Sequence, residues 1–278
     1  MKIGIVGGGF VGSATSILEC KDIQRITYDL DPARCYPPGT QKVDLLSCDI
    51  VFVCVPTPSY ASGECNTTIV ERCIRDLKGI GIKHIILRST VPPGTSEALD
   101  VSFMPEFLTE ANWRCDFYEC KLWVFGVNSE FEKAQCKELL TLAKDAGMIR
   151  SSEALFVCRN EAEMIKYVRN NYLAAKISFF NEINQLCGKI GIDYEAVRKG
   201  VTADERIGVS HTAVPGYDGH RGFGGTCLPK DTSALLSIME SADMESYIIR
   251  AIVERNRIVD RPEHDWEDDP RAFTNSVK

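Results

Sequence analysis

The chain has 278 residues, of which 44% are hydrophobic and 26% charged, and its formal net charge is −7. These values are typical of a soluble globular protein with room for one large domain or two ordinary ones. The acidic balance argues against a nucleic-acid or anionic-membrane partner, which requires a basic face. No stretch approaches the ~20 apolar residues of a membrane span, and the apolar run after Lys2 passes into glycines without a cleavage-site pattern.

Cysteine is abundant, with 12 residues, but no Cys-x-x-Cys pair occurs and the four histidines offer no ligand spacing beside them. Neither a zinc site nor a disulfide framework is therefore expected. We predict reduced thiols, no metal, and a cytoplasmic location.

The N-terminal stretch has the pattern of a dinucleotide-binding unit. Residues 2–6 predict a buried parallel strand, and the next six residues fit G-x-G-x-x-G. Residues 13–20 predict a helix, and residues 25–28 a second strand that ends in Asp29. Asp29 is placed to bind a ribose 2′-hydroxyl, which favours NAD, although Arg34 could accept a 2′-phosphate instead. An FAD or non-nucleotide version of the fold is the alternative. The predicted cofactor-binding residues here are Gly7, Gly9, Phe10, Val11, Gly12, Asp29 and Arg34.

Further strands end in polar loops. The strand 49–55 stops at Pro56-Thr57-Pro58, and the strand 84–87 runs into a loop containing Thr90. Ligands lie at the carboxyl ends of strands in open α/β sheets, so both threonines are candidates, with a simple turn as the alternative for Thr57. A strand at 101–104 leads to Glu106 and Glu110, which would share one side of a helix and handle protons, unless they are merely solvated.

The remaining elements complete the fold prediction. Helices at 67–77 and 130–146 alternate with the strands, and strands at 122–125 and 154–157 finish the set. This alternation predicts an α/β fold with a doubly wound, largely parallel Rossmann-type sheet over residues 1–158.

Residues 159–261 predict an all-helical central domain. Helical periodicity runs from 161 to 189, longer than ordinary globular helices, and leaves an apolar flank large enough to suggest a homodimer. Lys166 and Asn170 lie one turn apart on another flank, a spacing that is usually just surface. Shorter helices follow at 194–200, 232–241 and 245–259, with a glycine-rich binding loop at 204–220. Residues 262–278 predict an acidic, flexible tail. The expected apolar flank consists of Ile165, Val168, Tyr172, Leu173, Ile177, Phe180, Ile183 and Leu186.

The stretch 223–231 carries the strongest chemical signal. Gly224 and Gly225 allow close backbone approach, and Cys227 precedes a proline that can open a helix. A thiol at a helix start near Lys230 has its pKa lowered toward the reactive thiolate, and Asp231 one turn on could shuttle protons. The plainer interpretation is a buried structural cysteine before a capped helix.

Seven segments in order give the chain a resemblance to the UDP-glucose/GDP-mannose dehydrogenase family, the nucleotide-sugar 6-dehydrogenases, and most to its UDP-glucose branch. They cover residues 1 to about 260, and they are residues 7–12, 55–58, 88–94, 105–110, 161–182, 204–208 and 223–231. The resemblance implies NAD as cofactor and oxidation of a sugar C6 alcohol to the carboxylate, UDP-glucose to UDP-glucuronate. The aldehyde would be captured by Cys227 as a thiohemiacetal that is oxidised to a thioester.

The same resemblance implies roles for individual residues. Lys166 and Asn170 would stabilise the oxyanion, while Glu110, Asp231 and Thr90 would handle protons. It also implies contacts with the substrate and the cofactor beyond these. The substrate would be bound by Glu106, Phe107, Leu108, Lys166, Asn170, Phe223 and Gly224, and by Arg206 across a dimer interface; the cofactor would also contact Thr57, Thr90, Glu110 and Lys230.

The chain departs from the family in two places. Family members continue into a third domain that closes over the nucleotide sugar, so a shortened form is expected here, and residues 31–49 lack the usual helix. Two alternatives stay open: a two-electron β-hydroxyacid dehydrogenase, which needs no thiol, and a non-catalytic or weakly active NAD-binding remnant.

Overall fold

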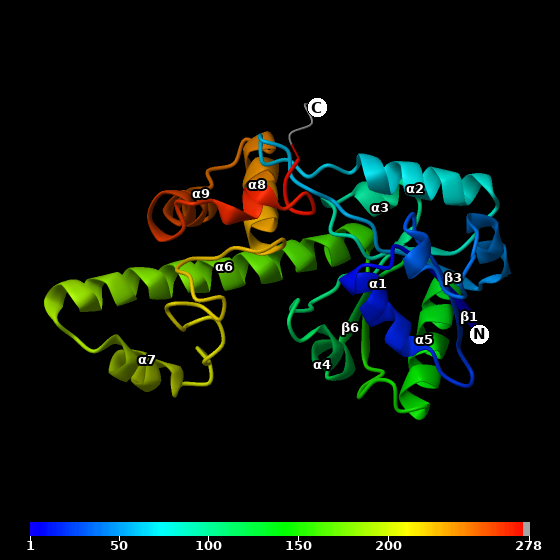
Figure 1. Cartoon of the computed structure of the whole chain (residues 1–278), viewed down its shortest axis with the longest axis horizontal. Helices are drawn as coiled ribbons and strands as arrows, with labels where there is room; N and C mark the ends of the chain where they lie inside the picture. Colours follow the sequence, from blue (N-terminus) through cyan, green and yellow to red (C-terminus); the bar gives the residue numbers. More distant parts are fainter. Residues whose placement is uncertain (275–278) are drawn as a thin grey trace. The chain divides into compact units, whose positions relative to one another are not determined.

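The computed structural model describes residues 1–274 and divides the chain into two compact units. The first unit comprises Met1–Thr57 and Thr67–Lys166, and the second comprises Pro58–Asn66 with the chain from Tyr167 onward. The division falls within a single long helix, eight residues after the boundary that the sequence predicts between 158 and 159. Figure 1 traces the chain through the elements of both units.

The first unit is built on a seven-stranded sheet in the order β2-β1-β3-β4-β5-β6-β7. Every neighbouring pair is parallel except β5 and β6, which meet through one antiparallel pair, Phe103 with Gly126. The sheet confirms the predicted Rossmann-type fold, and all seven predicted strands are present. The strands are β1 (Lys2–Val6), β2 (Gln24–Tyr28), β3 (Ile50–Val53), β4 (Ile85–Leu87), β5 (Ser102–Phe103), β6 (Trp123–Gly126) and β7 (Ala154–Val157).

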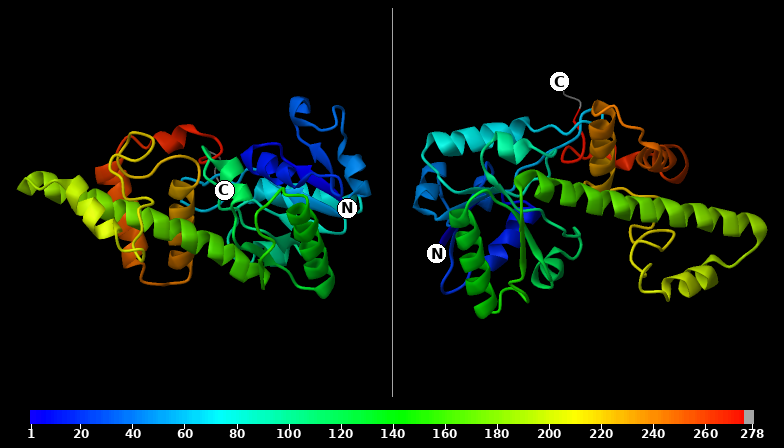
Figure 2. Two further views of the ribbon diagram at one scale, coloured as in Figure 1. Left: turned by 90° about the horizontal axis from the view of Figure 1, so that it is seen from below. Right: turned by 180° about the vertical axis from the view of Figure 1, so that it is seen from behind.

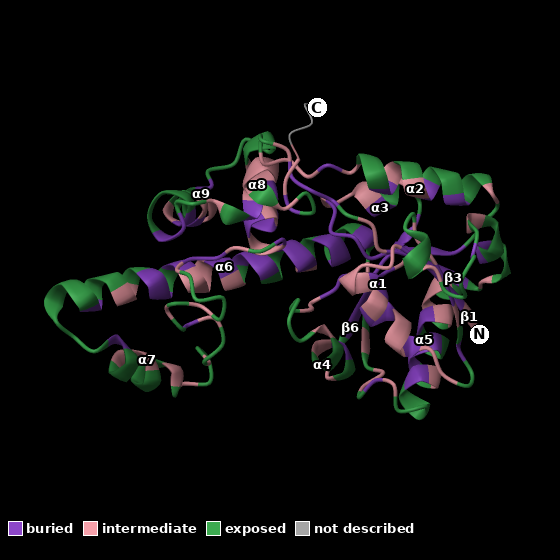
Figure 3. Ribbon diagram, in the orientation of Figure 1, coloured by how far each residue is buried: buried purple, intermediate pink, exposed green. Residues whose placement is uncertain are grey.

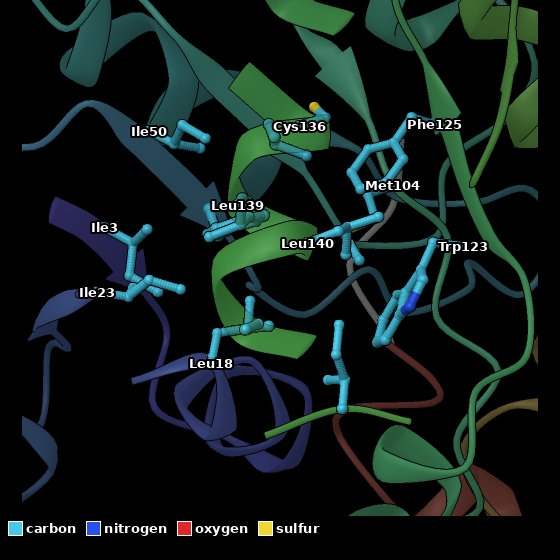
Figure 4. Close-up of a cluster of buried hydrophobic side chains, with 14 of the residues drawn as sticks. Ile3, Leu18, Ile23, Ile50, Met104, Trp123, Phe125, Cys136, Leu139 and Leu140 are labelled. Atoms are coloured by element: carbon cyan, nitrogen blue, oxygen red, sulfur yellow. The ribbon is translucent and has the colours of Figure 1, made fainter. Parts of the chain in front are cut away.

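Helices cover both faces of the sheet because the central strands are apolar on both sides. One core packs α1 (Phe10–Thr15), η1 (Ser16–Leu18) and α5 (Glu130–Asp145) on the strands, with α4 (Trp113–Tyr118) at its edge. Figure 4 shows Leu139 of α5 on the side of Ile3 and Ile50, and Leu140 on the side of Met104 and Trp123. The other core packs α2 (Thr68–Gly79) against the opposite face, beside α3 (Thr95–Ala98).

Two segments of this unit differ from regular helices. Residues 31–49 hold only two 3-10 turns, η2 (Pro32–Arg34) and η3 (Lys42–Ser47), in agreement with the predicted lack of a helix. The conditional helix over 105–110 is wrong, since this stretch is irregular. Glu106 is buried and hydrogen-bonded to the backbone N–H of Leu108, whereas Glu110 is exposed, so the two carboxylates do not form a pair on one helix face.

The second unit is helical, and most of the long helix α6 (Arg159–Ile190) belongs to it. The long run of α6 can be traced in Figures 1 and 2. Phe180 and Cys187 of α6 pack against Tyr194 at the start of α7 (Tyr194–Thr202). Further toward the N-terminus of α6, α8 (Leu228–Ser241) and α9 (Tyr247–Arg255) contribute two more small cores, and α9 continues into the π-turn η4 (Asn256–Asp260). The all-helical prediction is thereby confirmed.

The last part of the chain differs from the expected flexible tail over the residues that are described. Residues 265–268 form the 3-10 turn η5 (Asp265–Asp268), and Trp266 and Ala272 are buried. The N–H of Ser59 donates to the carbonyl of Ala272, and the N–H of Thr274 donates to the carbonyl of Ser59, so an extended backbone bridge fixes this segment. The apolar Trp266 provides a burial driving force that the acidic composition concealed. Residues 275–278 lie outside the described residues.

Within residues 1–274, no helix has the length and apolarity needed to cross a bilayer, and no cluster of three or more metal-ligating side chains is found. All twelve cysteines are free thiols.

Candidate functional site

The glycine loop of the first unit has the geometry of a dinucleotide cradle. Gly7 has φ +97°, and a Cβ there would lie 2.5 Å from the carbonyl oxygen of Cys54. A Cβ on Gly12 would lie 1.9 Å from the carbonyl oxygen of Gly7, so both positions require glycine. Gly9 caps α1 without a side chain, and Phe10 and Val11 form its first turn, which leaves N–H groups available to a pyrophosphate. The residues present fit a bound dinucleotide.

Asp29 lies at the carboxyl end of β2, as the sequence predicts. Its carboxylate accepts hydrogen bonds from the N–H of Gly8 at 2.6 Å and from the N–H of Asp31 at 2.8 Å. This fixes the carboxylate beside the glycine loop. Arg34 also lies here, with its Cβ 2.9 Å from where a Cβ on Gly8 would stand, and its guanidinium is paired with Asp31 at 3.4 Å.

The loops after β3 and β4 are joined to each other. The hydroxyl of Ser89 donates to the carbonyl of Val55 at 2.7 Å, and the buried Thr57 and Thr90 lie on these two loops. The guanidinium of Arg88 is buried and donates to the hydroxyl of Thr15 in α1. Polar groups from the ends of β3 and β4 therefore gather at the edge where a Rossmann-type sheet binds its ligand.

A buried ion pair joins α6 to the segment after β5. The ammonium of Lys166 donates to the Glu106 carboxylate at 2.6 Å and to the Glu106 carbonyl at 2.7 Å. Burial alone raises the pKa of Glu106, but the Lys166 ammonium and the hydrogen bonds from Lys166 and Leu108 outweigh it and hold that pKa below its usual range. Lys166 also lies 5.8 Å from the ring centre of Phe107. Two of the predicted substrate residues, Glu106 and Phe107, thus lie at the Lys166 amine, and the N–H of the third, Leu108, donates to the Glu106 carboxylate.

Glu163, one turn before Lys166, was not predicted as a site residue. Its carboxylate is fully buried and accepts from the N–H of Gly94 at 2.6 Å and from the N–H and hydroxyl of Ser96 at 2.7 and 2.6 Å. Burial raises the pKa of Glu163 despite these hydrogen bonds. Glu163 anchors the end of the loop that carries Thr90.

The second unit brings four of the predicted catalytic and cofactor residues together. Asp231 is fully buried, and its two carboxylate oxygens accept from the Asn170 amide and from the Lys230 ammonium, each at 2.6 Å. Cys227 is the residue before α8, with Pro229 in the first turn as predicted. Burial alone lowers the pKa of Lys230, but the charge of Asp231, and then those of Cys65 and Cys227, outweigh it and raise that pKa above its usual range. The Lys230 ammonium therefore lies close enough to Cys227 for its charge to interact with the thiol.

The loop before Cys227 is anchored to α6 and to the end of α9. Phe223 is buried, and its backbone exchanges two hydrogen bonds with the Asn256 side chain. Asn181 of α6 accepts from the N–H of Gly222, and Arg221 donates to the Asn184 side chain at 2.7 Å. Asn181 and Asn184 were not among the predicted site residues.

Arg206 is placed apart from this group. Its side chain is 88% exposed and pairs with Asp204 of the same turn. The contact of Arg206 with substrate across a dimer interface stays a prediction.

A cavity of about 380 Å³ lies within the second unit beside the start of α8. Pro229 and Lys230 form one wall, and Trp266 and Phe273 of the terminal segment form another. The terminal segment therefore takes part in the surroundings of Lys230.

The geometry defines a class: a Rossmann-type dinucleotide-binding unit with a helical unit that presents a thiol beside a buried ammonium and carboxylate. Comparison with known proteins specifies the family. Residues 39–143 match the NAD binding domain, and residues 160–258 the central domain, of the UDP-glucose/GDP-mannose dehydrogenase family. The chain belongs to this family, and its first unit holds the family's NAD-binding domain.

Individual relatives agree with this assignment. The chain is 34% identical over 228 residues to a UDP-glucose 6-dehydrogenase of Rickettsia bellii, covering 77% of this chain and 50% of that protein. It is 35% identical over 224 residues to UDP-glucose 6-dehydrogenase TuaD of Bacillus subtilis, covering 75% and 46%. A UDP-glucose dehydrogenase structure from Pyrobaculum islandicum superposes with a TM-score of 0.79 at 27% identity, covering 92% and 68%. The chain spans about half the length of the curated relatives it matches.

Proposed function

We propose that this protein oxidises the C6 alcohol of UDP-glucose to the carboxylate of UDP-glucuronate in two NAD-dependent steps. The observation that carries the proposal is the position of Cys227 at the start of α8, where the Lys230 ammonium, held on the buried Asp231, acts on its thiol. A cation near a thiol favours the thiolate, which is the nucleophilic form.

The proposed chemistry balances as follows. NAD, when bound, supplies the acceptor for the hydride that leaves C6 in each oxidation. After the first, the Cys227 thiolate adds to the aldehyde carbon, forming a C–S bond while the carbonyl electron pair moves to oxygen. Loss of the second hydride from that carbon leaves a thioester. Water then adds, the C–S bond breaks, and the thiolate is regenerated; one alcohol, two NAD and one water give one carboxylate, two NADH and three protons.

The other residues are proposed to serve the charges that develop in these steps. The amide of Asn170 and the ammonium of Lys166 would stabilise the oxyanion, a contribution of about 3 kcal/mol for each donor removed in comparable sites. Asp231, with Thr90 and Glu110, would accept and return protons. Because Asp231 already accepts from both Asn170 and Lys230, its carboxylate is oriented before substrate arrives.

We also propose that α6 pairs with α6 of a second copy. Its exposed apolar side chains form a stripe. Figure 3 shows buried, intermediate and exposed positions following one another along α6. The stripe repeats every 11 residues, a period that keeps one face of a nearly straight helix apolar. Such a self-complementary face suits a two-fold dimer. The stripe consists of Met164, Val168, Tyr172, Phe179, Leu186 and Ile190, with the half-buried Ala175 and Ile183 between them.

The decisive experiment counts NADH formed per UDP-glucose consumed, by absorbance and product analysis. Two NADH per sugar, together with UDP-glucuronate, is the expected result. One NADH per sugar with the aldehyde or a simple ketone as product would instead indicate a two-electron dehydrogenase. NAD binding without NADH formation on any nucleotide sugar would indicate a non-catalytic relative.

A second experiment isolates the thiol. Cys227→Ser should abolish acid formation while NAD binding is retained, because the hydroxyl cannot form the thioester. In the parent protein, iodoacetamide should label Cys227 faster than the exposed Cys115 and Cys158. Burial raises the pKa of Cys48, Cys54 and Cys73 to about 11 and that of Cys136 to about 12, so these four thiols should label slowly and leave the comparison clean. Labelling of Cys227 no faster than Cys115 would contradict the proposal.

A further inference from the structure

Arg261 is a buried cation at the end of η4 that contacts the loop leading to Cys227. Only 3% of the residue is exposed. A Cβ built on Gly224 would lie 2.3 Å from the Arg261 Cζ and 2.5 Å from its Nη2, so the guanidinium lies directly against the Gly224 backbone. No side chain other than hydrogen could stand at Gly224 without displacing the guanidinium.

Two carboxylates hold the Arg261 guanidinium in place. Its Nε and Nη2 donate to the two carboxylate oxygens of Asp265 at 2.6 and 2.5 Å, a bidentate pair. Its Nη1 donates to Asp218 at 2.6 Å, in the loop that precedes the thiol. Burial lowers the pKa of Arg261, but these hydrogen bonds outweigh it and the net shift is upward. Bidentate pairing to a planar guanidinium fixes orientation as well as position.

The neighbouring residues of η4 contact the same loop. Asn256 is 1% exposed; its side-chain oxygen accepts from the N–H of Phe223 at 2.8 Å, and its amide donates to the Phe223 carbonyl at 2.9 Å. At Gly222, where φ is +64°, a Cβ would lie 2.3 Å from the same Asn256 oxygen. The loop is therefore held at Gly222, Phe223 and Gly224 by residues 256–261.

We propose that Arg261 is a positioning residue for the thiol: braced by Asp218 and Asp265, its guanidinium fixes the Gly224 backbone and so sets where Cys227 lies at the start of α8. The inference rests on the proposed function, because it assumes that Cys227 reacts. Gly224 lies three positions before Cys227, and only Gly225, with φ +71°, and Thr226 lie between them. Neither a salt bridge nor an apolar anchor is available to a glycine, so a planar cation packed on its backbone is what restrains it.

The test is a double-mutant cycle read by the rate of Cys227 alkylation with iodoacetamide, measured by mass spectrometry. Arg261→Ala should lower the rate constant for Cys227 about tenfold, relative to Cys115 in the same sample, since small displacements of a reacting group cost factors of this order. Gly224→Ala alone should have a similar effect, because its Cβ would displace the guanidinium. Adding Gly224→Ala to Arg261→Ala should lower the alkylation rate constant of Cys227 little further, because the guanidinium with which the new Cβ would clash is already absent.

Matched controls separate positioning from folding. Arg257→Ala removes an ion pair with Glu267 in the same segment, 3.0 Å long and partly exposed, and should leave the Cys227 rate within about twofold. Asp265→Asn keeps the Arg261 guanidinium but weakens its bidentate pairing, so the alkylation rate constant of Cys227 should fall by less than in Arg261→Ala. Thermal unfolding of each variant should show a native transition, and with UDP-glucose and NAD the Arg261→Ala loss should appear in kcat rather than in the KM for NAD.

The outcomes are distinct. If the parent Cys227 does not react selectively, the proposed function fails. If the parent reacts fast and folded Arg261→Ala or Arg261→Lys reacts equally fast, the positioning role is refuted while the function stands. Additive effects of Gly224→Ala and Arg261→Ala would also refute it, since the contact predicts that they are coupled.

Discussion

At the residue scale, several buried charges of the chain are held in complete ion pairs, such as Lys166 with Glu106 and Lys230 with Asp231. Lys166 and Glu106 are 3% and 5% exposed and satisfy each other with further bonds to backbone. A buried pair of this kind adds little net stability compared with apolar residues, but removing one partner leaves an uncompensated charge. The pair is therefore a costly way to stabilise a fold and a reasonable way to hold an amine ready for chemistry.

Glu106→Gln should lower the free energy of unfolding by about 3 kcal/mol at pH 7, because the Lys166 ammonium stays buried without a counter-ion. Urea unfolding of both proteins measures this. The native pKa of Glu106 is depressed below its model-compound value of 4.5, so its contribution is fully present above pH 4.5 and is lost as the pH falls through the lower native pKa. The difference in the free energy of unfolding between the parent and Glu106→Gln should therefore shrink as the pH falls through that pKa. Glu110→Gln, at an exposed position, serves as the control, and an equal loss in both variants would contradict the prediction.

Glu163→Gln should destabilise the protein by about 2 kcal/mol, since its amide would place N–H donors against the N–H groups of Gly94 or Ser96. Hydrogen exchange of residues 90–96 should accelerate in the variant, while exchange in α7 stays as in the parent. Unchanged protection of this loop would show that Glu163 does not anchor it.

At the scale of elements, α6 combines a buried polar side with an exposed apolar stripe. Asn171 donates to the Asp231 carbonyl at 3.1 Å, while Tyr172, the next residue, is 64% exposed. The expected apolar flank is thus divided: Phe180 is buried, whereas Val168, Tyr172 and Leu186 are exposed. An exposed apolar stripe of this length is the surface that the proposed pairing of α6 with a second copy would cover.

Tyr172→Glu combined with Phe179→Glu should convert a dimer into a monomer at micromolar concentration, as measured by light scattering after gel filtration. Because the interface is symmetric, two new carboxylates in each copy put four carboxylates into the dimer interface. The cost of desolvating these charges opposes association. Lys189→Glu, an exposed charge change on the same helix outside the stripe, is the control. A parent protein that is itself monomeric at this concentration would eliminate the proposed interface.

Elements were predictable where local pattern determines them. The runs 2–6 and 49–55 are continuous and apolar, and Pro229 marks the first turn of α8, so these features could be predicted from the sequence. Residues 105–110 were not predictable, because the Glu106 side chain bonds the Leu108 N–H and Lys166, contacts that no spacing rule encodes. Cys227, Lys230 and Asp231 are close in sequence, so their grouping could be predicted. Arg261 contacts Gly224 from 37 residues further along the chain, and no local sequence pattern indicates that contact.

At the scale of the whole molecule, each unit has its own buried cores, and all seven strands of the sheet lie in the first. Its glycine cradle and Asp29 need no residue of the second unit to form. Cofactor binding can therefore be measured as a property separate from turnover, which distinguishes an inactive relative from a misfolded protein.

NAD should raise the melting temperature and NADP should not, because the Asp29 carboxylate would repel a 2′-phosphate. At 100 times its Kd, a ligand that binds only the native state stabilises it by ~2.7 kcal/mol. For a unit of this size that corresponds to roughly 5–11 °C, measured by differential scanning fluorimetry. Asp29→Asn should narrow the difference between the melting-temperature shifts that NAD and NADP produce. If Arg34 is the group that accepts the 2′-phosphate, adding Arg34→Ala to Asp29→Asn should widen that difference again. Equal shifts by NAD and NADP in the parent would mean that Arg34, rather than Asp29, sets cofactor choice.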